Sequence, residues 1–332
     1  MRGIDRPLAE AYDVGVLDLD GVVYVGQDAV DGAAEALNAA QSGGMHLAFV
    51  TNNAARPPSV VGDHLRELGI DARDEDVVTS AQAAARLMAD QLPEGSRVFL
   101  MGGEGLDLAL RERGLVPVTS GTEDVAGVVQ GYGPDMPWKQ VMQGATLVRA
   151  GLPWVASNTD LTIPTPYGTA PGHGVLVGLL SEFADVQPAV AGKPERPLLD
   201  ETMRRVGGSR PLMVGDRLDT DIDGAINAAC DSLLVMTGVT DLGQLVAVRA
   251  GRRPTYVAPD LSGLLEAHGS PTVTDGVAEQ GGWRAHADGA RLTVDGNGAA
   301  GDWWRVVAAA AWARLDDGGE PVDTAGLEPP DA

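Results

Sequence analysis

Two aspartates follow an apolar run near the start of the chain, in the order Val14-Gly15-Val16-Leu17-Asp18-Leu19-Asp20-Gly21. The run predicts a buried strand, and Asp18 and Asp20, two residues apart, would then point to the same face at its carboxyl end. Open α/β sheets place their chemistry at that end. One carboxylate of such a pair can act as a nucleophile and the other as an acid and base, provided that a cation offsets their repulsion.

Three later segments supply the other groups that such a site needs. They are Thr51-Asn52-Asn53 after an apolar strand at 45–50, Gly192-Lys193-Pro194 in a loop, and Gly215-Asp216 with Asp221 after an apolar strand at 211–214. Together with the first pair they offer four carboxylates, one hydroxyl and one ammonium. This combination predicts a site with a cation and room for a phosphate group.

Lysine is rare in this sequence, which gives Lys193 weight. The chain has 24 Lys and Arg residues, and only Lys139 and Lys193 are lysines. A compact ammonium fits between a carboxylate and a phosphate where a planar guanidinium does not. We therefore interpret Lys193 as a site residue, and Lys139, after Pro137-Trp138 at a predicted helix start, as a surface residue.

The four motifs Asp18-Leu19-Asp20-Gly21, Thr51, Lys193 and Asp216 with Asp221 resemble, in order, those of haloacid dehalogenase (HAD) superfamily phosphatases. One acidic turn would be a weak signal, but the ordered set is specific. The resemblance implies that Asp18 is the nucleophile and forms an aspartyl-phosphate. It also implies that Asp20 is the general acid and base, that Thr51 binds the phosphoryl oxygens, and that Lys193 neutralises the phosphate.

A magnesium ion is the cofactor that the resemblance implies. Asp18, Asp216 and the backbone carbonyl of Asp20 would bind Mg²⁺ directly, and Asp221 would bind it through a water. Mg²⁺ suits such an all-oxygen, partly hydrated shell. Clustered carboxylates are also difficult to keep charged without a cation.

Substrate-binding candidates also come from the resemblance, and several keep two interpretations. The candidates are Thr51, Asn52, Asn53, Arg56, Asn158 and Asp160. Arg56 could orient the phosphate or pair with a surface carboxylate. Asn158 and Asp160 could form an Asx-type turn or help close a cap over the substrate.

Two glycine-rich stretches are interpreted without a role in binding. His173, between Gly172 and Gly174, is taken as incidental to a turn in preference to a substrate contact. Gly102-Gly103-Glu104-Gly105 lacks the glycine spacing of a dinucleotide loop, so we reject that interpretation.

The predicted helix 221–229 departs from the superfamily at its end. Cys230 stands where the superfamily usually has a glycine, which would serve a left-handed helix cap.

Strand and helix patterns predict the fold class: α/β, with a doubly wound, mostly parallel, Rossmann-like sheet. The predicted strands are 14–19, 45–50, 211–214, 232–236 and 255–258, and the predicted helices are 31–42, 195–206 and 221–229. The long segment between Thr51 and Lys193 exceeds a connection inside a compact domain. It carries strands at 97–101, 125–130 and 154–156 and a helix at 138–150, so we interpret it as an inserted α/β cap domain.

The domain boundaries that we predict divide the core in two. They are 1–79 and 189–268 for the HAD core, 80–188 for the cap and 269–332 for a carboxyl-terminal extension. A large insert at this place resembles the type IIA subfamily, which includes NagD and p-nitrophenylphosphatase-like enzymes and has a C2-type cap. The amino-acid sequences of 77–82, 190–194 and 253–256 are most similar to those of actinobacterial glycerol-3-phosphate phosphatases. The resemblance to the subfamily spans roughly residues 12 to 265.

The extension is predicted to be a small β-β-α unit. Strands at 283–287 and 291–295 flank Asp288-Gly289, a hairpin signal. A helix at 302–315 carries the apolar stripe Trp303, Trp304, Val307 and Trp312. The stripe could dock on the body of the protein or form a dimer or partner surface, and we favour docking. Residues 316–332 are predicted to be a disordered acidic tail.

Composition limits partners and location. A net charge of −23 over 332 residues argues against nucleic acid and anionic membranes as partners. The single cysteine excludes an internal disulfide framework. No run of 18 apolar residues occurs, and the amino terminus is too polar for a signal peptide. We expect a cytoplasmic enzyme whose partner is a small phosphorylated metabolite, and a homodimer stays open.

The favoured function is Mg²⁺-dependent phosphomonoester hydrolysis through an aspartyl-phosphate, with glycerol 3-phosphate as the substrate. Alternatives are 2-phosphoglycolate, pyridoxal 5′-phosphate or nucleoside monophosphates. A phospho-acceptor signalling protein is less favoured, because Asp20 would promote hydrolysis of the phosphoryl group and a cap would have no purpose. A phosphoryl-transferring mutase or ATP-driven machine is also disfavoured, since those ATPases carry threonine at the position of Asp20.

Overall fold

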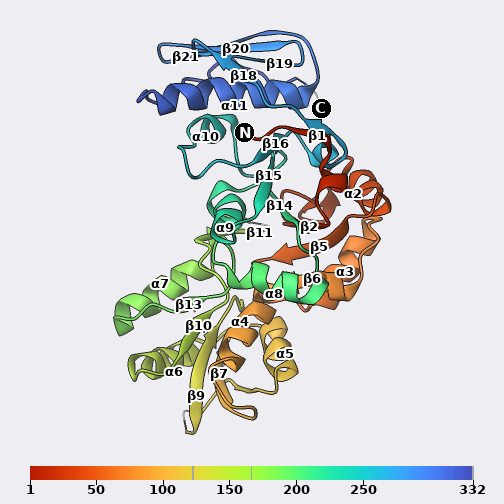
Figure 1. Ribbon diagram of the computed structural model, residues 1–332. Helices are drawn as coiled ribbons and strands as arrows, with labels where there is room; N and C mark the ends of the chain where they lie inside the picture. Colours follow the sequence, from red (N-terminus) through yellow and green to blue (C-terminus); the bar gives the residue numbers. More distant parts are fainter. Residues whose placement is uncertain (122, 166, 331–332) are drawn as a thin grey trace. The chain divides into compact units, whose positions relative to one another are not determined.

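The computed structural model describes residues 1–121, 123–165 and 167–330 (Figure 1). They form two compact units: Met1–Ala48, Leu68–Asp71 and Gly208–Ala332 make the first, and Phe49–Glu67 and Ala72–Gly207 the second. Strand β5 (His46–Thr51) begins in the first unit and ends in the second. No helix of the described residues has the length and apolar character that crossing a membrane requires.

Parallel strands form the centre of the first unit. Their order is β16-β15-β14-β2-β5, with β2 (Val14–Leu17), β14 (Pro211–Gly215), β15 (Asp231–Val235) and β16 (Tyr256–Ala258). The strands are apolar along nearly their whole length, as expected of strands covered on both faces. The register places Leu17 opposite Val214, so the two strands end side by side. The predicted parallel α/β core is confirmed.

Short helices and strands complete this unit. They are β1 (Ile4–Pro7), α1 (Leu8–Ala11), β3 (Tyr24–Val25), β4 (Asp28–Ala29), α2 (Ala33–Ser42), α9 (Asp223–Asn227), α10 (Leu242–Val246), a 3₁₀ helix at Leu261–Leu265 and β17 (Ala267–His268). The predicted helix 221–229 is divided in two, because a π-helical turn, Leu218–Ile222, precedes α9.

The second unit contains a five-stranded parallel sheet. Its order is β13-β10-β9-β7-β8, with β7 (Arg97–Met101), β8 (Val116–Val118), β9 (Val125–Gln130), β10 (Trp154–Ala156) and β13 (Ala189–Val190). Helices α6 (Trp138–Arg149) and α7 (His173–Ala184) lie on one side, and α4 (Ser80–Ala89) and α5 (Glu104–Glu112) on the other (Figure 1). The predicted α/β insert is confirmed, while its limits of 80 and 188 stay a prediction.

The remaining elements of the second unit lie outside this five-stranded sheet. They are α3 (Pro58–Glu67), a 3₁₀ turn at Asp74–Asp76, β6 (Val77–Thr79), the hairpin β11 (Thr162–Thr165) and β12 (Gly168–Pro171), and α8 (Pro197–Val206). The end of β5 pairs in parallel with β6, with Thr51 opposite Thr79. Helix α8 starts at Pro197, where proline is favoured because the first helical amide has no intrahelical partner.

The carboxyl-terminal extension is larger than the predicted β-β-α unit. The predicted hairpin and helix are present as β20 (Trp283–Asp288), β21 (Arg291–Gly296) and α11 (Ala300–Asp316). Two further strands, β18 (Thr272–Thr274) and β19 (Val277–Gln280), complete an antiparallel sheet of order β18-β19-β20-β21. These strands are mostly polar and exposed, so they lack the alternation of apolar and polar residues by which a strand is predicted from the sequence.

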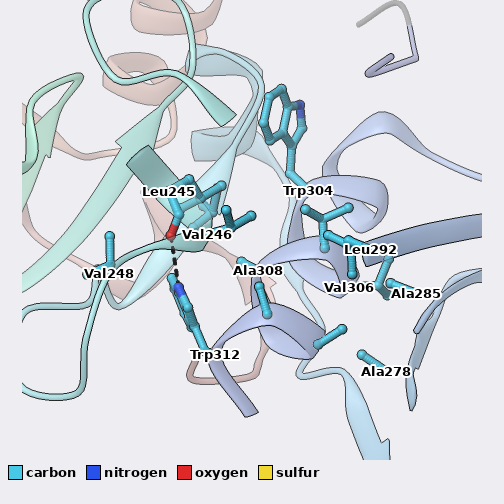
Figure 2. Packing of buried hydrophobic residues seen from close by; sticks show 14 of the residues in the cluster. Leu245, Val246, Val248, Ala278, Ala285, Leu292, Trp304, Val306, Ala308 and Trp312 are labelled. Atoms are coloured by element: carbon cyan, nitrogen blue, oxygen red, sulfur yellow. Dashed lines mark hydrogen bonds between the residues drawn. The ribbon is translucent and has the colours of Figure 1, made fainter. Parts of the chain in front are cut away.

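Helix α11 docks on the body of the first unit. It lies between the four-stranded sheet and the region of α10 and β16 (Figure 1). Trp312 is buried, and its indole N–H donates a hydrogen bond of 2.9 Å to the carbonyl of Leu245 (Figure 2). Trp303 and Trp304 pack edge to face with their ring centroids 5.0 Å apart. The docking interpretation of the tryptophan stripe is therefore confirmed.

Two residues of the predicted tail after α11 contact the extension. Val322 is buried in the same apolar cluster as Trp312. The backbone of Asp323 bridges to β21, since its N–H donates to Ala290 over 2.6 Å and its carbonyl accepts from Leu292 over 3.4 Å. These contacts connect Val322 and Asp323 to the extension, while the disorder of the tail stays a prediction. The last two residues of the tail, 331 and 332, lie outside the described residues.

The end of helix α9 corrects the expectation for Cys230. The left-handed residue is Ala229, with φ of 56°, and not Cys230. The amide of Cys230 donates to the carbonyl of Ala225, and that of Ala229 to the carbonyl of Ile226, each over 3.0 Å. These two bonds define a Schellman cap, in which glycine is favoured at the position of Ala229. Burial raises the pKa of the Cys230 thiol to about 11.

Replacing Ala229 by glycine should therefore stabilise the protein. An alanine in the left-handed region costs about 1–2 kcal/mol, and this side chain is exposed, so Ala229→Gly removes strain without losing packing. We expect a gain of about 1 kcal/mol in the free energy of unfolding, measured by denaturant titration. Ala228→Gly is the matched control, because Ala228 has φ of −85° and should gain nothing. Equal effects of the two substitutions would contradict the strain at Ala229.

Candidate active site

Asp18 directly continues strand β2. Its amide donates to the carbonyl of Val214 over 2.9 Å, so it still pairs with β14. The next residue, Leu19, is fully buried, and its carbonyl accepts hydrogen bonds from the amides of Val22, Val23 and Tyr24. This tight turn starts within two residues of the strand. Asp18 thus lies at the end of a buried strand, and Asp20, two residues on, is exposed.

Asp216 and Asp221 join Asp18 at this edge of the sheet. Asp216 follows β14, and Asp221 lies in the π-helical turn; both are fully buried. Asp216 Oδ2 accepts from the amide of Val239 over 2.6 Å, and Asp221 Oδ2 accepts from that of Arg217 over 3.1 Å. One carboxylate oxygen from each of the three aspartates lies within 4.8 Å of the others. The structure thus brings together three of the four predicted metal ligands through their carboxylates.

Glycines let the backbone approach these carboxylates closely. A Cβ atom at Gly238 would lie 2.0 Å from Asp216 Oδ2, and one at Gly21, whose φ is +85°, would lie 2.6 Å from the same oxygen. Thr237 Oγ1 also donates to the carbonyl of Gly21 over 2.6 Å. The segment 237–239 is a part of the site that was not predicted. Its signal in the sequence was its position directly after the predicted strand 232–236.

The donor set fits a hard divalent cation. All three side chains offer carboxylate oxygens, which Mg²⁺ and Ca²⁺ prefer. Three negative charges this close, two of them fully buried, repel one another and are costly to desolvate. A cation bound among them removes both costs, and the surrounding glycines keep the space narrow. Asp18, Asp216 and Asp221 are therefore the residues that would hold it.

In the second unit, Thr51 and Asn53 shape the loop after β5. Thr51 is buried at the end of the strand, and its Oγ1 accepts from the amide of Asn53 over 3.0 Å. Asn53 Oδ1 in turn accepts from the amide of Ala55 over 2.9 Å. These two amides have partners within the loop, so we expect phosphoryl contacts from the Thr51 hydroxyl and not from them. The Arg56 side chain is exposed and keeps both of its interpretations.

Asn52 connects this loop to Lys193. Its amide oxygen accepts from the backbone N–H of Lys193 over 2.8 Å, and its amide nitrogen donates to the carbonyl of Lys193 over 2.9 Å. The lysine is buried, with 2% of its surface exposed. A Cβ atom at Gly192 would lie 2.5 Å from Asn52 Oδ1, so only glycine permits this approach. The contact with Asn52 thus explains why a glycine precedes Lys193.

Asn158 and Asp160 lie beside Asn52. Asn158 Oδ1 accepts from the amide of Asp160 over 3.1 Å, which is the Asx-type turn considered from the sequence. Asn158 is buried, and its amide nitrogen donates to the carbonyl of Asn52 over 2.7 Å. The carboxylate of Asp160 accepts from Asn52 Nδ2 at 3.1 and 3.2 Å. Asn158 is therefore used within the protein, while a substrate contact of Asp160 stays a prediction.

His173 opens helix α7 and is buried. Burial lowers its pKa to about 4, so the imidazole is neutral near pH 7. The glycines on either side do more than form a turn. A Cβ atom at Gly172 would lie 2.3 Å from the carbonyl of Asp160, and one at Gly174 would lie 2.1 Å from that of Thr159. The start of α7 therefore packs directly on the turn that carries Asp160.

Two family models match this chain. One, described as haloacid dehalogenase-like hydrolase, matches residues 15–116, and the other, described as HAD-hydrolase-like, matches residues 190–264. Both parts of the predicted core are thus matched, on either side of most of the insert. All four predicted motifs fall inside the two matched ranges.

Individual relatives extend this likeness. The chain is 40% identical over 322 residues to D-glycerol 3-phosphate phosphatase of Mycobacterium tuberculosis, covering 94% of this chain and 89% of that protein. It is 36% identical over 253 residues to acid sugar phosphatase of Staphylococcus aureus, covering 76% of this chain and 96% of that protein.

Among solved structures, the glycerol phosphate phosphatase of M. tuberculosis in complex with magnesium is similar with a TM-score of 0.84 and 39% identity. The match covers 93% of this chain and 92% of that one. The likeness therefore includes the fold of almost the whole chain. The chain belongs to the haloacid dehalogenase-like hydrolase family and is one of its phosphatases.

Proposed function

We propose that this phosphatase hydrolyses glycerol 3-phosphate with the help of Mg²⁺ and through an aspartyl-phosphate on Asp18. The cluster of Asp18, Asp216 and Asp221 carries the proposal, because a carboxylate nucleophile needs a cation beside it and oxygens of these three carboxylates lie within 4.8 Å of one another. The choice of substrate is supported by the 94% coverage of this chain in its match to a D-glycerol 3-phosphate phosphatase.

The proposed reaction has two steps. Asp18 attacks phosphorus, the ester P–O bond breaks, and Asp20 gives a proton to the leaving glycerol oxygen. Asp20 then accepts a proton from the water that attacks the aspartyl-phosphate, which releases phosphate and restores Asp18. Thr51 would hydrogen-bond the phosphoryl oxygens, and Lys193 would offset their charge. Bound Mg²⁺ would neutralise the charge that the carboxylates and the phosphoryl group share.

Other small phosphate esters remain the alternative substrates, chiefly 2-phosphoglycolate, pyridoxal 5′-phosphate and nucleoside monophosphates. We further propose that the enzyme acts in the cytoplasm on free metabolites, without nucleic acid or membrane partners. The net charge of −23 supports this, since it repels polyanions and anionic surfaces. A homodimer stays a prediction, favoured by the exposed apolar side chains of Val175, Leu179 and Phe183 along α7.

Adding Mg²⁺ to metal-free protein should raise its melting temperature. At a concentration about a hundred times Kd, the bound ion stabilises the folded state by about 2.7 kcal/mol. We expect this shift to disappear in Asp216→Asn, measured by thermal unfolding in EDTA and in Mg²⁺. Asp219→Asn is the matched control, because Asp219 lies in the π-helical turn beside Asp221 but is exposed and pairs with Arg217. An equal shift in Asp216→Asn would rule out this cluster as the metal site.

A phosphate-release screen tests the substrate. It should include both enantiomers of glycerol 3-phosphate, 2-phosphoglycolate, pyridoxal 5′-phosphate, nucleoside monophosphates and p-nitrophenyl phosphate. We expect kcat/KM of about 10⁴ M⁻¹s⁻¹ or more for one glycerol 3-phosphate enantiomer, and only background for Asp18→Asn. Weak, even activity across the panel would leave the phosphatase chemistry but refute the glycerol assignment. Activity retained in Asp18→Asn would refute the nucleophile.

Asp20→Asn should separate the two half-reactions. We expect kcat for glycerol 3-phosphate to fall by about 10²–10⁴-fold, because the alkoxide leaving group needs a proton. p-Nitrophenolate leaves without one, so with that ester the first step should persist and aspartyl-phosphate should accumulate, measured by rapid acid quench. Equal losses in the first step for both esters would contradict the role of Asp20 as the acid.

A further inference from the structure

The side chain of Asn52 is fully oriented by protein groups. Its Oδ1 faces the N–H of Lys193 at 2.8 Å, and its Nδ2 faces the carbonyl of the same residue at 2.9 Å. A backbone N–H can only donate and a carbonyl can only accept, so these two bonds fix which end of the amide is which. The second hydrogen of Nδ2 points to the carboxylate of Asp160, at 3.1 and 3.2 Å.

This arrangement leaves no side-chain N–H of Asn52 for a substrate. An asparagine amide has two hydrogens, and Lys193 and Asp160 accept one each. The backbone of Asn52 is held as well, because its carbonyl accepts from Ser80 Oγ over 2.6 Å and from Asn158 Nδ2 over 2.7 Å. Asn52 was predicted from the sequence to bind substrate, and the geometry favours a different role.

We infer that Asn52 is a positioning residue that sets the location of the Lys193 ammonium and couples it to Asp160. The four-methylene stem of a lysine is flexible in solution, but that of Lys193 is buried and has little freedom, so the backbone position that Asn52 fixes decides where the ammonium lies. The fit depends on Gly192, which allows Asn52 Oδ1 to approach the chain directly before the lysine. This inference rests on the proposed function insofar as Lys193 acts on a phosphoryl group.

Kinetics of Asn52→Ala test this role. A misplacement of about 1 Å in a reacting group can cost about 10²-fold in rate, so we expect kcat to fall by about that factor with little change in KM. The loss should be equal for glycerol 3-phosphate and p-nitrophenyl phosphate, since both present the same phosphoryl group to Lys193. A loss confined to glycerol 3-phosphate would show that Asn52 contacts the glycerol part and would overturn the inference.

Coupling to Lys193 is tested by a double-mutant cycle. In a Lys193→Met background, Asn52→Ala should cause no further loss of kcat, because its effect passes through the ammonium. Independent, multiplicative losses would contradict the inference.

The exchanged pair Asn52→Asp with Asp160→Asn is a second test of the bond to Lys193. It restores an amide and a carboxylate at these positions but not the bond to the Lys193 carbonyl. It should stay impaired, and full recovery would also overturn the inference.

Lysine NMR gives a readout that is independent of activity. Protein labelled with ¹⁵N at lysine Nζ should show two signals, from Lys193 and from Lys139, which is exposed on α6. We expect Asn52→Ala to shift or broaden the Lys193 signal and to leave that of Lys139 unchanged. An unchanged Lys193 signal would refute the positioning role. If the signal responds but the wild-type protein hydrolyses no phosphate ester, the proposed function fails and the placement of Lys193 stands.

Asn38→Ala is the matched control for both measurements. Asn38 also bridges two backbone groups of another segment, donating to the carbonyl of Gly69 over 2.9 Å and accepting from the amide of Asp71 over 3.2 Å. It lies on α2 in the other unit. We expect Asn38→Ala to keep kcat and both lysine signals. Equal effects of the two substitutions would mean that the loss of a bridging amide acts through stability, against the role given to Asn52.

Discussion

Mutual repulsion of three carboxylates is the constraint on which the first unit depends. Two unit charges about 4 Å apart interact by about 4 kcal/mol at an effective dielectric constant of about 20, and here three lie within 4.8 Å. The fold must hold them together before a cation arrives. It does so with rigid parts: the parallel register that ends β2 beside β14, and the π-helical turn that directs Asp221 to the same edge. A mobile loop would let the charges separate, and the cation would then have to restore their positions at a cost in affinity.

In the second unit, the fold must position the ammonium of a long side chain, that of Lys193. A strand end fixes a short aspartate side chain well, but it cannot fix the far end of a lysine. Here a single amide, that of Asn52, is bonded to both backbone polar groups of Lys193, 141 positions away in the sequence. Asn158 and Ser80 hold Asn52 in turn. Because the stem of Lys193 is buried, we infer that this network of side-chain to backbone bonds sets the position of its charge.

This difference explains what could be predicted from the sequence. Asp18 and Asp216 follow apolar runs, and parallel strands bring their carboxyl ends to one edge, so local pattern was sufficient. The role of Asn52 depends on partners more than a hundred positions away, and no periodicity reports such a contact. The left-handed residue at Ala229 was misplaced by one position, since only the backbone geometry distinguishes it from Cys230. Strands β18 and β19 pack against helix α11, and Val322 is buried in the apolar cluster that this helix forms. Their positions therefore depend on tertiary contacts that a local sequence pattern does not report.

Helix α11 also bears on the carboxylate cluster, although it contributes no carboxylate to it. The apolar cluster that buries Trp303, Trp304 and Trp312 includes Ile222, the last residue of the π-helical turn, and Leu218, the first, packs against it. Asp221 is thus held between a residue anchored in this core and its own bond to the Arg217 amide. Trp312 reaches the same region through its hydrogen bond to Leu245 (Figure 2). The extension is therefore part of the support of the carboxylate cluster: the turn that positions Asp221 packs on one side against the site and on the other against the core that α11 completes.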